Sequence, residues 1–196
     1  MRLAIAAVAA FSVLPACLGP RTDSSRYFTL PSAGAPSAGA PSAGTAVDSV
    51  GIGPVTLPPY LSRPEMATRV GPEQVAYAAN DRWAAPLEEL TVLALQEELR
   101  ARLPAREILH WPWPLVDPPE LAATVEFLRF EADAAGGATL QARWTVTARG
   151  RAPVSGETLR QEKGAPGDVP GSVAALGKGL RALASDLAAA ARPPGG

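Results

Sequence analysis

The chain has very few of the side chains on which most enzyme active sites and metal sites depend. Its 196 residues include one histidine, His110, and one cysteine, Cys17. A lone imidazole with no serine, cysteine or acid motif beside it does not make a catalytic triad. One histidine and one cysteine fall short of the usual ligand set of a zinc site, and one cysteine cannot close a disulfide within the chain. The sequence therefore predicts a protein that is not an enzyme and has no metal or other non-covalent cofactor.

Basic blocks and long apolar runs are also missing. The chain has 18 Lys and Arg against 19 Asp and Glu, and the two signs are interspersed. Without a basic patch, the sequence gives no sign of nucleic-acid binding. The apolar run at 3–13 is eleven residues long, whereas a membrane-spanning helix needs about 20. Neither a nucleic-acid-binding protein nor a transmembrane helix is predicted.

The first residues have the pattern of a lipoprotein signal. Arg2 precedes the apolar run, which ends at Leu14-Pro15-Ala16-Cys17. A bulky aliphatic residue, one variable position, a small residue and then cysteine make a lipobox, and its thiol takes a diacylglyceryl thioether. Cleavage before Cys17 removes 1–16 as the signal peptide, and the freed amine can be acylated. The alternative is an ordinary secretory signal with an incidental cysteine. Leu18, in place of an aspartate, favours the outer membrane over the inner one.

The rest of the chain divides into a tether, one domain and a tail. Residues 17–25 form a short lipidated tether, 26–192 the domain, and 193–196 a Pro/Gly tail that follows the last helix. Within the domain, 31–45 repeats a Pro-Ser-Ala-Gly unit three times. These residues carry no large apolar side chain, so the segment is predicted to be a loop.

Hydrophobic periodicity predicts two helices and a mixed sheet. One helix follows Pro86 and runs to about Leu103, and a second covers about 172–192, each with apolar residues spaced three and four apart. A long hairpin of 121–131 and 139–149 alternates apolar and polar residues, with a bulge near Leu128. Further extended segments are predicted at 26–30, 49–57, 66–70, 74–78, 108–113 and 158–163. The pattern favours a single compact α/β domain.

Three segments combine aromatic residues with prolines, at 58–64, 80–87 and 111–114. Prolines limit the ordering cost of binding, and tryptophans make good anchors, so the segments suit a protein interface. They suit loop packing equally well. Gly51-Ile52-Gly53 lacks the third glycine and the following helix of a phosphate loop. We interpret its glycines as permitting a bend or close strand packing.

These segments also resemble a known family. The matching pieces are Tyr27-Phe28-Thr29-Leu30, then Val50-Gly51-Ile52-Gly53-Pro54-Val55-Thr56-Leu57-Pro58-Pro59-Tyr60-Leu61, then Arg63-Pro64-Glu65-Met66-Ala67-Thr68-Arg69, then Asp81-Arg82-Trp83-Ala84-Ala85-Pro86-Leu87, and the hairpin around Phe130 and Arg143-Trp144. In this order and spacing they resemble the PqiC-like auxiliary lipoproteins of ABC-type and MCE-type envelope transport systems.

The resemblance implies a fold and a role. The fold is an α/β/α sandwich with a mixed sheet, similar to anticodon-binding domains. The role is non-enzymatic: help in moving lipid between the two membranes, with the protein anchored at the periplasmic face of the outer membrane. Its partners would be an MCE protein and an ABC permease with its ATPase, and homo-oligomerisation stays open. Within the matching segments we expect Tyr60, Arg63, Arg82 and Trp83 to contact a partner.

Two rival functions remain at this point. The chain could be a structural, pilot or activator lipoprotein of another envelope machine. A neighbouring gene cluster for an ATPase, a permease and an MCE protein would decide against that. It could also be an enzyme, if His110 were found in a polar cleft with a carboxylate within hydrogen-bond reach.

Replacing the predicted lipid-acceptor residue tests the anchor. We expect a Cys17→Ser chain to remain unprocessed and to leave the membrane fraction, because the hydroxyl cannot form the thioether. Mass spectrometry of the native N-terminal peptide should show diacylglycerol and an N-linked acyl chain on Cys17. An unmodified Cys17, or a serine variant that is still cleaved and still sediments with membranes, contradicts the prediction.

Overall fold

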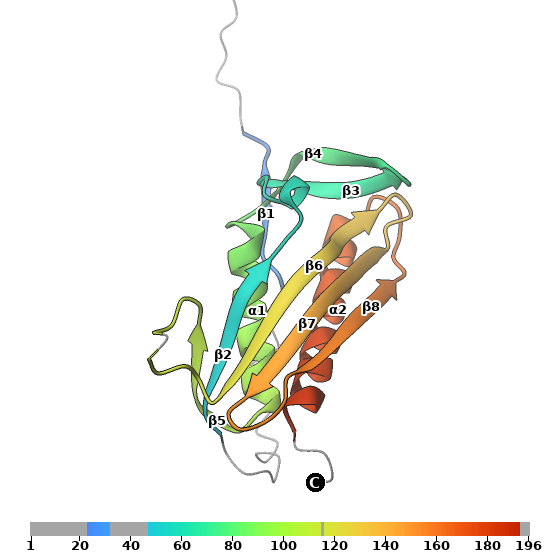
Figure 1. The fold of residues 1–196 in the computed structure, drawn as a ribbon. Coiled ribbons are helices and arrows are strands. Elements are labelled where there is room, and N and C mark those ends of the chain that lie inside the picture. Colours follow the sequence, from blue (N-terminus) through green and yellow to red (C-terminus); the bar gives the residue numbers. More distant parts are fainter. Residues whose placement is uncertain (1–22, 32–46, 115, 193–196) are drawn as a thin grey trace, which may run out of the picture.

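The computed structural model describes residues 23–31, 47–114 and 116–192, and shows one curved sheet with two helices behind it (Figure 1). Eight strands belong to the sheet, which mixes parallel and antiparallel pairs. The mixed α/β class predicted from periodicity is therefore confirmed. The predicted signal peptide, the lipidated Cys17, nearly all of the repeat loop 31–45 and the tail lie outside the described residues.

The long hairpin of β6 (Leu121–Asp133) and β7 (Ala138–Ala148) is the centre of the sheet. It is paired along its whole length, and its register shifts between Phe127 and Arg129. The predicted bulge is thus confirmed. The shift puts Phe127 and Phe130 on the same buried face, with ring centroids 5.3 Å apart. β8 (Val154–Glu162) pairs with the free side of β7.

β2 (Val47–Thr56) runs parallel to β6 on the other side, and β5 (Ala105–His110) pairs with the outer edge of β2. The extended segment predicted at 108–113 therefore begins and ends three residues earlier. The strand predicted at 158–163 begins four residues earlier than predicted. Prolines cannot donate to a strand ladder, so β5 stops before Pro112.

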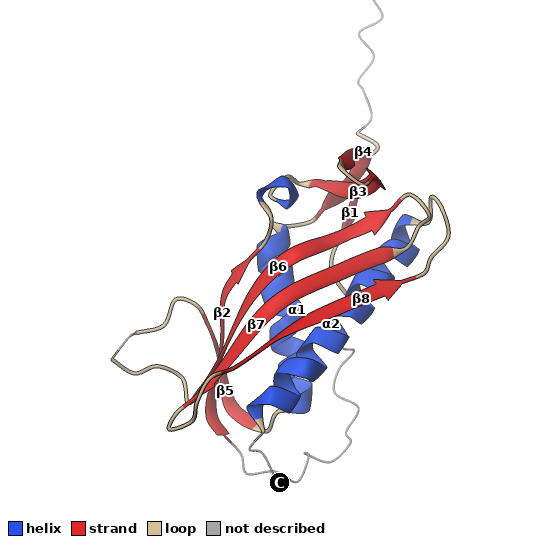
Figure 2. Ribbon diagram, turned by 45° about the vertical axis from the view of Figure 1, so that its right-hand side comes forward, coloured by secondary structure: helices blue, strands red, loops and turns tan. Residues whose placement is uncertain are grey.

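Both helices, α1 (Leu87–Arg102) and α2 (Val169–Ala191), lie on the same face of the sheet and contact each other (Figure 2). The predicted stripe of α2 is fully buried: Val173, Leu176, Leu180, Leu183 and Leu187. The fold class implied by the resemblance, a mixed sheet flanked by two main helices, is confirmed, with both helices packed on one face. The other face carries polar residues at outward-facing positions of β7, among them Gln141, Arg143 and Thr145.

A smaller part of the sheet, which we call the arm, projects from one end of the long strands (Figure 1). It consists of β1 (Arg26–Phe28), the 3₁₀ helix η1 (Pro59–Leu61), β3 (Glu65–Gly71) and β4 (Gln74–Trp83). β3 joins the main sheet through only two residue pairs, Thr68 with Ala132 and Arg69 with Asp133 of β6. Side chains must therefore supply much of the connection.

No helix in the described ranges combines the length and the apolarity that crossing a membrane requires.

Candidate functional site

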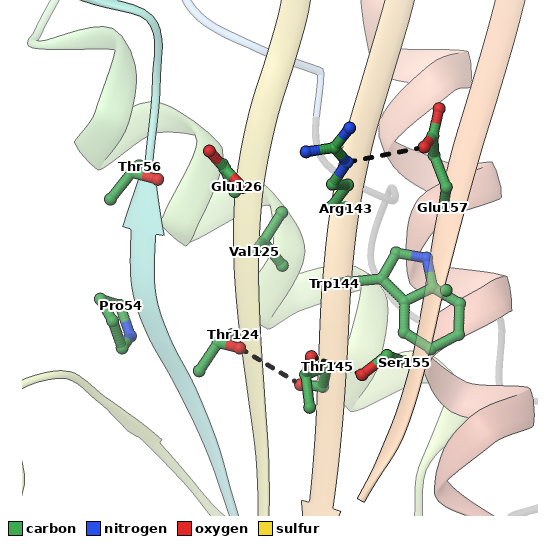
Figure 3. Close-up of a pocket in the computed structure, with 11 residues that line it drawn as sticks. Pro54, Thr56, Thr124, Val125, Glu126, Arg143, Trp144, Thr145, Ser155 and Glu157 are labelled. Atoms are coloured by element: carbon green, nitrogen blue, oxygen red, sulfur yellow. Dashed lines mark hydrogen bonds and ion pairs between the residues drawn. The ribbon is translucent and has the colours of Figure 1, made fainter.

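The face of the sheet turned away from the helices is open and polar (Figure 3). A shallow hollow of about 800 Å³ lies over it, between β2, β6, β7 and β8. Hydroxyl and charged side chains from neighbouring strands line the hollow and bond to one another. Thr145 Oγ1 lies 2.8 Å from Ser155 Oγ, and Arg143 Nε lies 3.7 Å from Glu157 Oε2. The face is a self-paired polar surface exposed to solvent.

This hollow combines hydroxyls with two carboxylates, those of Glu126 and Glu157. Its hydroxyls come from Thr56, Thr124, Thr145 and Ser155, and its lining contains no imidazole. His110 lies elsewhere, at the end of β5, where its Nδ1 is 2.7 Å from the backbone oxygen of Trp111. Among the residues that the structure describes, no group of three or more His, Cys, Asp or Glu side chains could hold a metal ion.

Of the four residues predicted to contact a partner, Trp83 and Tyr60 have internal roles. The Trp83 side chain belongs to the hydrophobic core, with 6% of its surface exposed. The Tyr60 hydroxyl donates a hydrogen bond to Glu131 on β6, and its carbonyl accepts one from Tyr77 Oη at 2.9 Å. Truncating Trp83 would open a cavity in the monomer, so a Trp83→Ala variant cannot report on partner binding alone.

The other two, Arg63 and Arg82, lie on one surface of the arm, where Arg63 is exposed and Arg82 is partly buried. Each guanidinium lies near the Glu65 carboxylate, at 4.0 Å from Arg63 and 3.9 Å from Arg82. Arg63 also lies 4.7 Å from the ring centre of Tyr77, a cation–π distance. Tyr27 is opposite Arg82 in the β1–β4 register and is 60% exposed. We call Tyr27, Arg63, Glu65 and Arg82 the arm face.

A buried carboxylate holds the arm against the main sheet. Glu131 projects from β6, and its side chain is completely covered. It accepts hydrogen bonds from Tyr60 of η1 and Arg69 of β3, and from Arg129 Nε on its own strand at 3.1 Å. One acidic group therefore joins three elements that the short β3–β6 pairing leaves weakly connected.

The same contacts set the ionisation of the cluster. Burial alone would raise the pKa of the Glu131 carboxyl, but hydrogen bonds from Arg69, Tyr60 and Arg129 outweigh burial and lower that pKa below its ordinary value. Burial and the hydrogen bond to Glu131 raise the pKa of Tyr60 to about 12. At neutral pH the carboxyl is charged and the phenol is neutral, as the hydrogen bond between them requires.

The glycines of Gly51-Ile52-Gly53 serve close packing, as predicted. A Cβ on Gly51 would lie 2.5 Å from Pro119 Cγ, and one on Gly53 would lie 2.5 Å from the Cβ of Trp111. Gly53 also has φ of 124°, a conformation that side-chain-bearing residues rarely adopt. The loop after β5 can therefore press directly against β2.

A family model for the ABC-type transport auxiliary lipoprotein component matches residues 28–188. The chain belongs to this family. The match begins at the last residue of β1 and ends three residues before the end of α2, so it includes β3, β4, the Glu131 cluster and nearly all of both helices. The PqiC-like resemblance of the sequence is thereby confirmed.

Solved structures are similar to this auxiliary lipoprotein, and two of them share its fold at TM-scores above 0.5. A crystal structure of an uncharacterised protein has 18% identity and a TM-score of 0.68, covering 85% of this chain and 97% of its own. A protein of the DUF330 family from Xanthomonas campestris has 14% identity and a TM-score of 0.66, covering 84% and 93%. The PelC dodecamer of Paraburkholderia phytofirmans is more distant, with 12% identity, a TM-score of 0.42, and coverage of 75% and 90%. No curated protein matches the sequence.

Neutralising Glu131 should weaken the auxiliary domain and change its response to acid. We expect Glu131→Gln to lower the free energy of unfolding at pH 7 by about 2 kcal/mol, since a charged hydrogen-bonded group is lost while the arginines still reach solvent. The pKa of Glu131 is lower in the folded protein than in the unfolded chain. The carboxylate therefore stabilises the folded state fully above its ordinary pKa of 4.5, and this stabilisation is lost as the pH falls through the pKa of the folded state.

Urea unfolding at pH 7 and pH 3 measures both effects. The loss caused by Glu131→Gln should shrink at pH 3, because the unfolded chain is protonated at this glutamate below its ordinary pKa of 4.5. Glu126→Gln, on the exposed outer face of the same strand, is the matched control and should change stability by less than about 0.5 kcal/mol. Equal losses for the two variants, or a Glu131→Gln loss that grows in acid, would contradict the assignment.

Proposed function

We propose that this protein is a non-enzymatic, lipid-anchored component of an MCE-type lipid transport system, which docks the transport bridge at the periplasmic face of the outer membrane. The observation that carries the proposal is the family match, which covers almost the whole described fold. The lipobox at 14–17 adds an anchor, and Leu18 favours the outer membrane. The proposed partners are an MCE protein and an ABC permease with its ATPase.

The short tether supports a docking role for the arm. At about 3.6 Å per extended residue, Asp23 lies within roughly 20 Å of Cys17 along the chain, and Tyr27 within about 35 Å. The chain enters the fold at β1, beside β4 (Figure 1). An anchor at Cys17 would therefore hold β1, and with it the arm, within about 35 Å of the membrane surface.

The arm face has the side chains of a partner contact. Tyr27 and Arg63 are each 60% exposed, and aromatic and arginine side chains are enriched in protein interfaces. Arg63 is 60% exposed and lies 4.0 Å from the Glu65 carboxylate, so its hydrogen-bond donors are available to a partner carboxylate. The proposed function assigns the arm face to the docking of a transport protein.

Gene neighbourhood separates this proposal from a pilot or activator lipoprotein of another machine. An ATPase, a permease and an MCE protein encoded beside this chain would support the transport assignment. Genes for a different envelope machine in that place would oppose it.

Co-purification tests the proposed partner and the arm face together. Tagged lipidated protein, extracted in a mild detergent, should recover the MCE protein, and Arg63→Glu should lower that recovery about tenfold by placing a like charge against the partner. Lys163→Glu makes the same charge change on an exposed residue after β8, outside the arm, and should have no effect. If wild-type protein recovers no MCE protein, the proposed partner is wrong. If the two variants behave alike, Arg63 is not part of the interface.

A further inference from the structure

The sheet has an unfilled position at its β5 edge. β5 pairs with β2 only as far as Ile52, opposite His110, whereas β2 continues to Thr56 (Figure 1). Within the described chain, no strand pairs with this last part of β2 on that side. A groove of about 430 Å³ lies there, between β2, the outward face of α1 and the end of β5.

Apolar side chains line this groove although it is open to water. Leu93 of α1 is 56% exposed and Trp111 is 43% exposed. Both belong to the lining, together with Val92, Ile52 and Val55. The close contact of Gly53 with Trp111 brings the indole against β2 and closes one end of the groove. Large apolar groups gathered in one concave place mark a binding site more often than scattered ones do.

The rim of the groove is acidic. Glu88 and Glu89 lie in the first turn of α1 and belong to the lining, in which His110 is the one basic side chain. Neither carboxylate forms an ion pair with another described residue; the ion pairs of α1 involve Glu98 instead. The positive end of a helix dipole is worth about half a charge, so it only partly offsets two carboxylates. The groove therefore favours a cation beside an apolar group.

We propose that this groove binds an extended protein segment in which apolar side chains alternate with lysine or arginine. Pro54 has no backbone N–H and Trp111 lies against Gly53, so side chains, and not main-chain pairing with β2, carry the recognition. Apolar side chains of the segment contact Leu93 and Trp111, and its basic side chains reach Glu88 and Glu89. The apolar contacts supply affinity, and the two carboxylates select for basic side chains.

A phospholipid fits the groove less well. An acyl chain would match the apolar lining, but the phosphate of its headgroup would lie against the carboxylates of the rim. A basic segment gains from both features. This groove adds to the proposed function the chemistry of a docking segment. It rests on the proposed function only in the statement that the segment belongs to a transport protein.

A model peptide tests the groove directly. Binding of a fluorescein-labelled peptide of four Val-Lys repeats to the full lipidated protein in non-ionic detergent is followed by fluorescence anisotropy, with micelles alone as the blank. We expect saturable binding that Glu88→Lys and Leu93→Ala each weaken about tenfold. A Val-Glu peptide of the same length should not bind, because its carboxylates would face those of Glu88 and Glu89.

Matched control variants show whether peptide binding depends on the groove or on charged and apolar side chains anywhere on the surface. Glu97→Lys makes the same charge change on an exposed residue of α1 outside the groove, and Leu159→Ala removes an exposed leucine on β8. Both should leave peptide binding unchanged, and thermal melts should show that all four variants are folded.

Three results would overturn the proposal: no peptide binding, equal effects of groove and control variants, or binding of cis-parinaric acid in place of the peptide with loss on Leu93→Ala. The last result would make the groove an acyl-chain site. Comparing peptide binding with the co-purification experiment distinguishes failure of the proposed function from failure of the groove assignment. If the peptide binds in the groove but wild-type protein recovers no MCE protein, the groove assignment stands and the transport partner does not.

Discussion

The fully buried carboxylate of Glu131 is the contact on which the placement of the arm depends. β6 and β3 share only two residue pairs, whereas Glu131 is hydrogen-bonded to η1 and to β3 at once. A charged group without its partners would be costly in that position, so it is stable only when Tyr60 and Arg69 are correctly placed. The same cluster helps to position the arm face. The Tyr60 carbonyl accepts a hydrogen bond from the Tyr77 hydroxyl, and the Arg63 guanidinium lies over the Tyr77 ring.

The two faces of the sheet have different roles. Two helices cover one face of the sheet and bury a continuous apolar core, while the other face is polar and pairs with itself. Binding features therefore concentrate at two places where the sheet is incomplete. One is the arm, at the end where the chain leads back to Cys17. The other is the edge where β5 stops short of β2, with exposed Leu93 and Trp111 beside acidic side chains.

Elements with strong periodicity could be predicted from the sequence, and those defined by tertiary contacts could not. The apolar stripe of α2 and the alternation of β6 and β7 fixed their burial, since each follows directly from the repeat of its backbone. Trp83 looked like an interface residue because aromatics suit both roles, and only the fold shows that it points into the core. Little in the local sequence distinguishes Glu131 from a solvated glutamate, because Tyr60 and Arg69, the partners from other elements, are more than sixty residues away. Leu93 did carry a signal: it is a large apolar residue off the buried stripe of α1.

Amide hydrogen exchange of the wild-type protein and Glu131→Gln, under conditions where both are folded, tests the central claim most directly. If Glu131 holds the arm, amides of β3 and β4 should exchange about tenfold or more faster in the variant, while those of β7 and α2 keep their protection. Unchanged exchange in β3 and β4, or an equal increase across the whole domain, would show that the arm does not depend on this carboxylate.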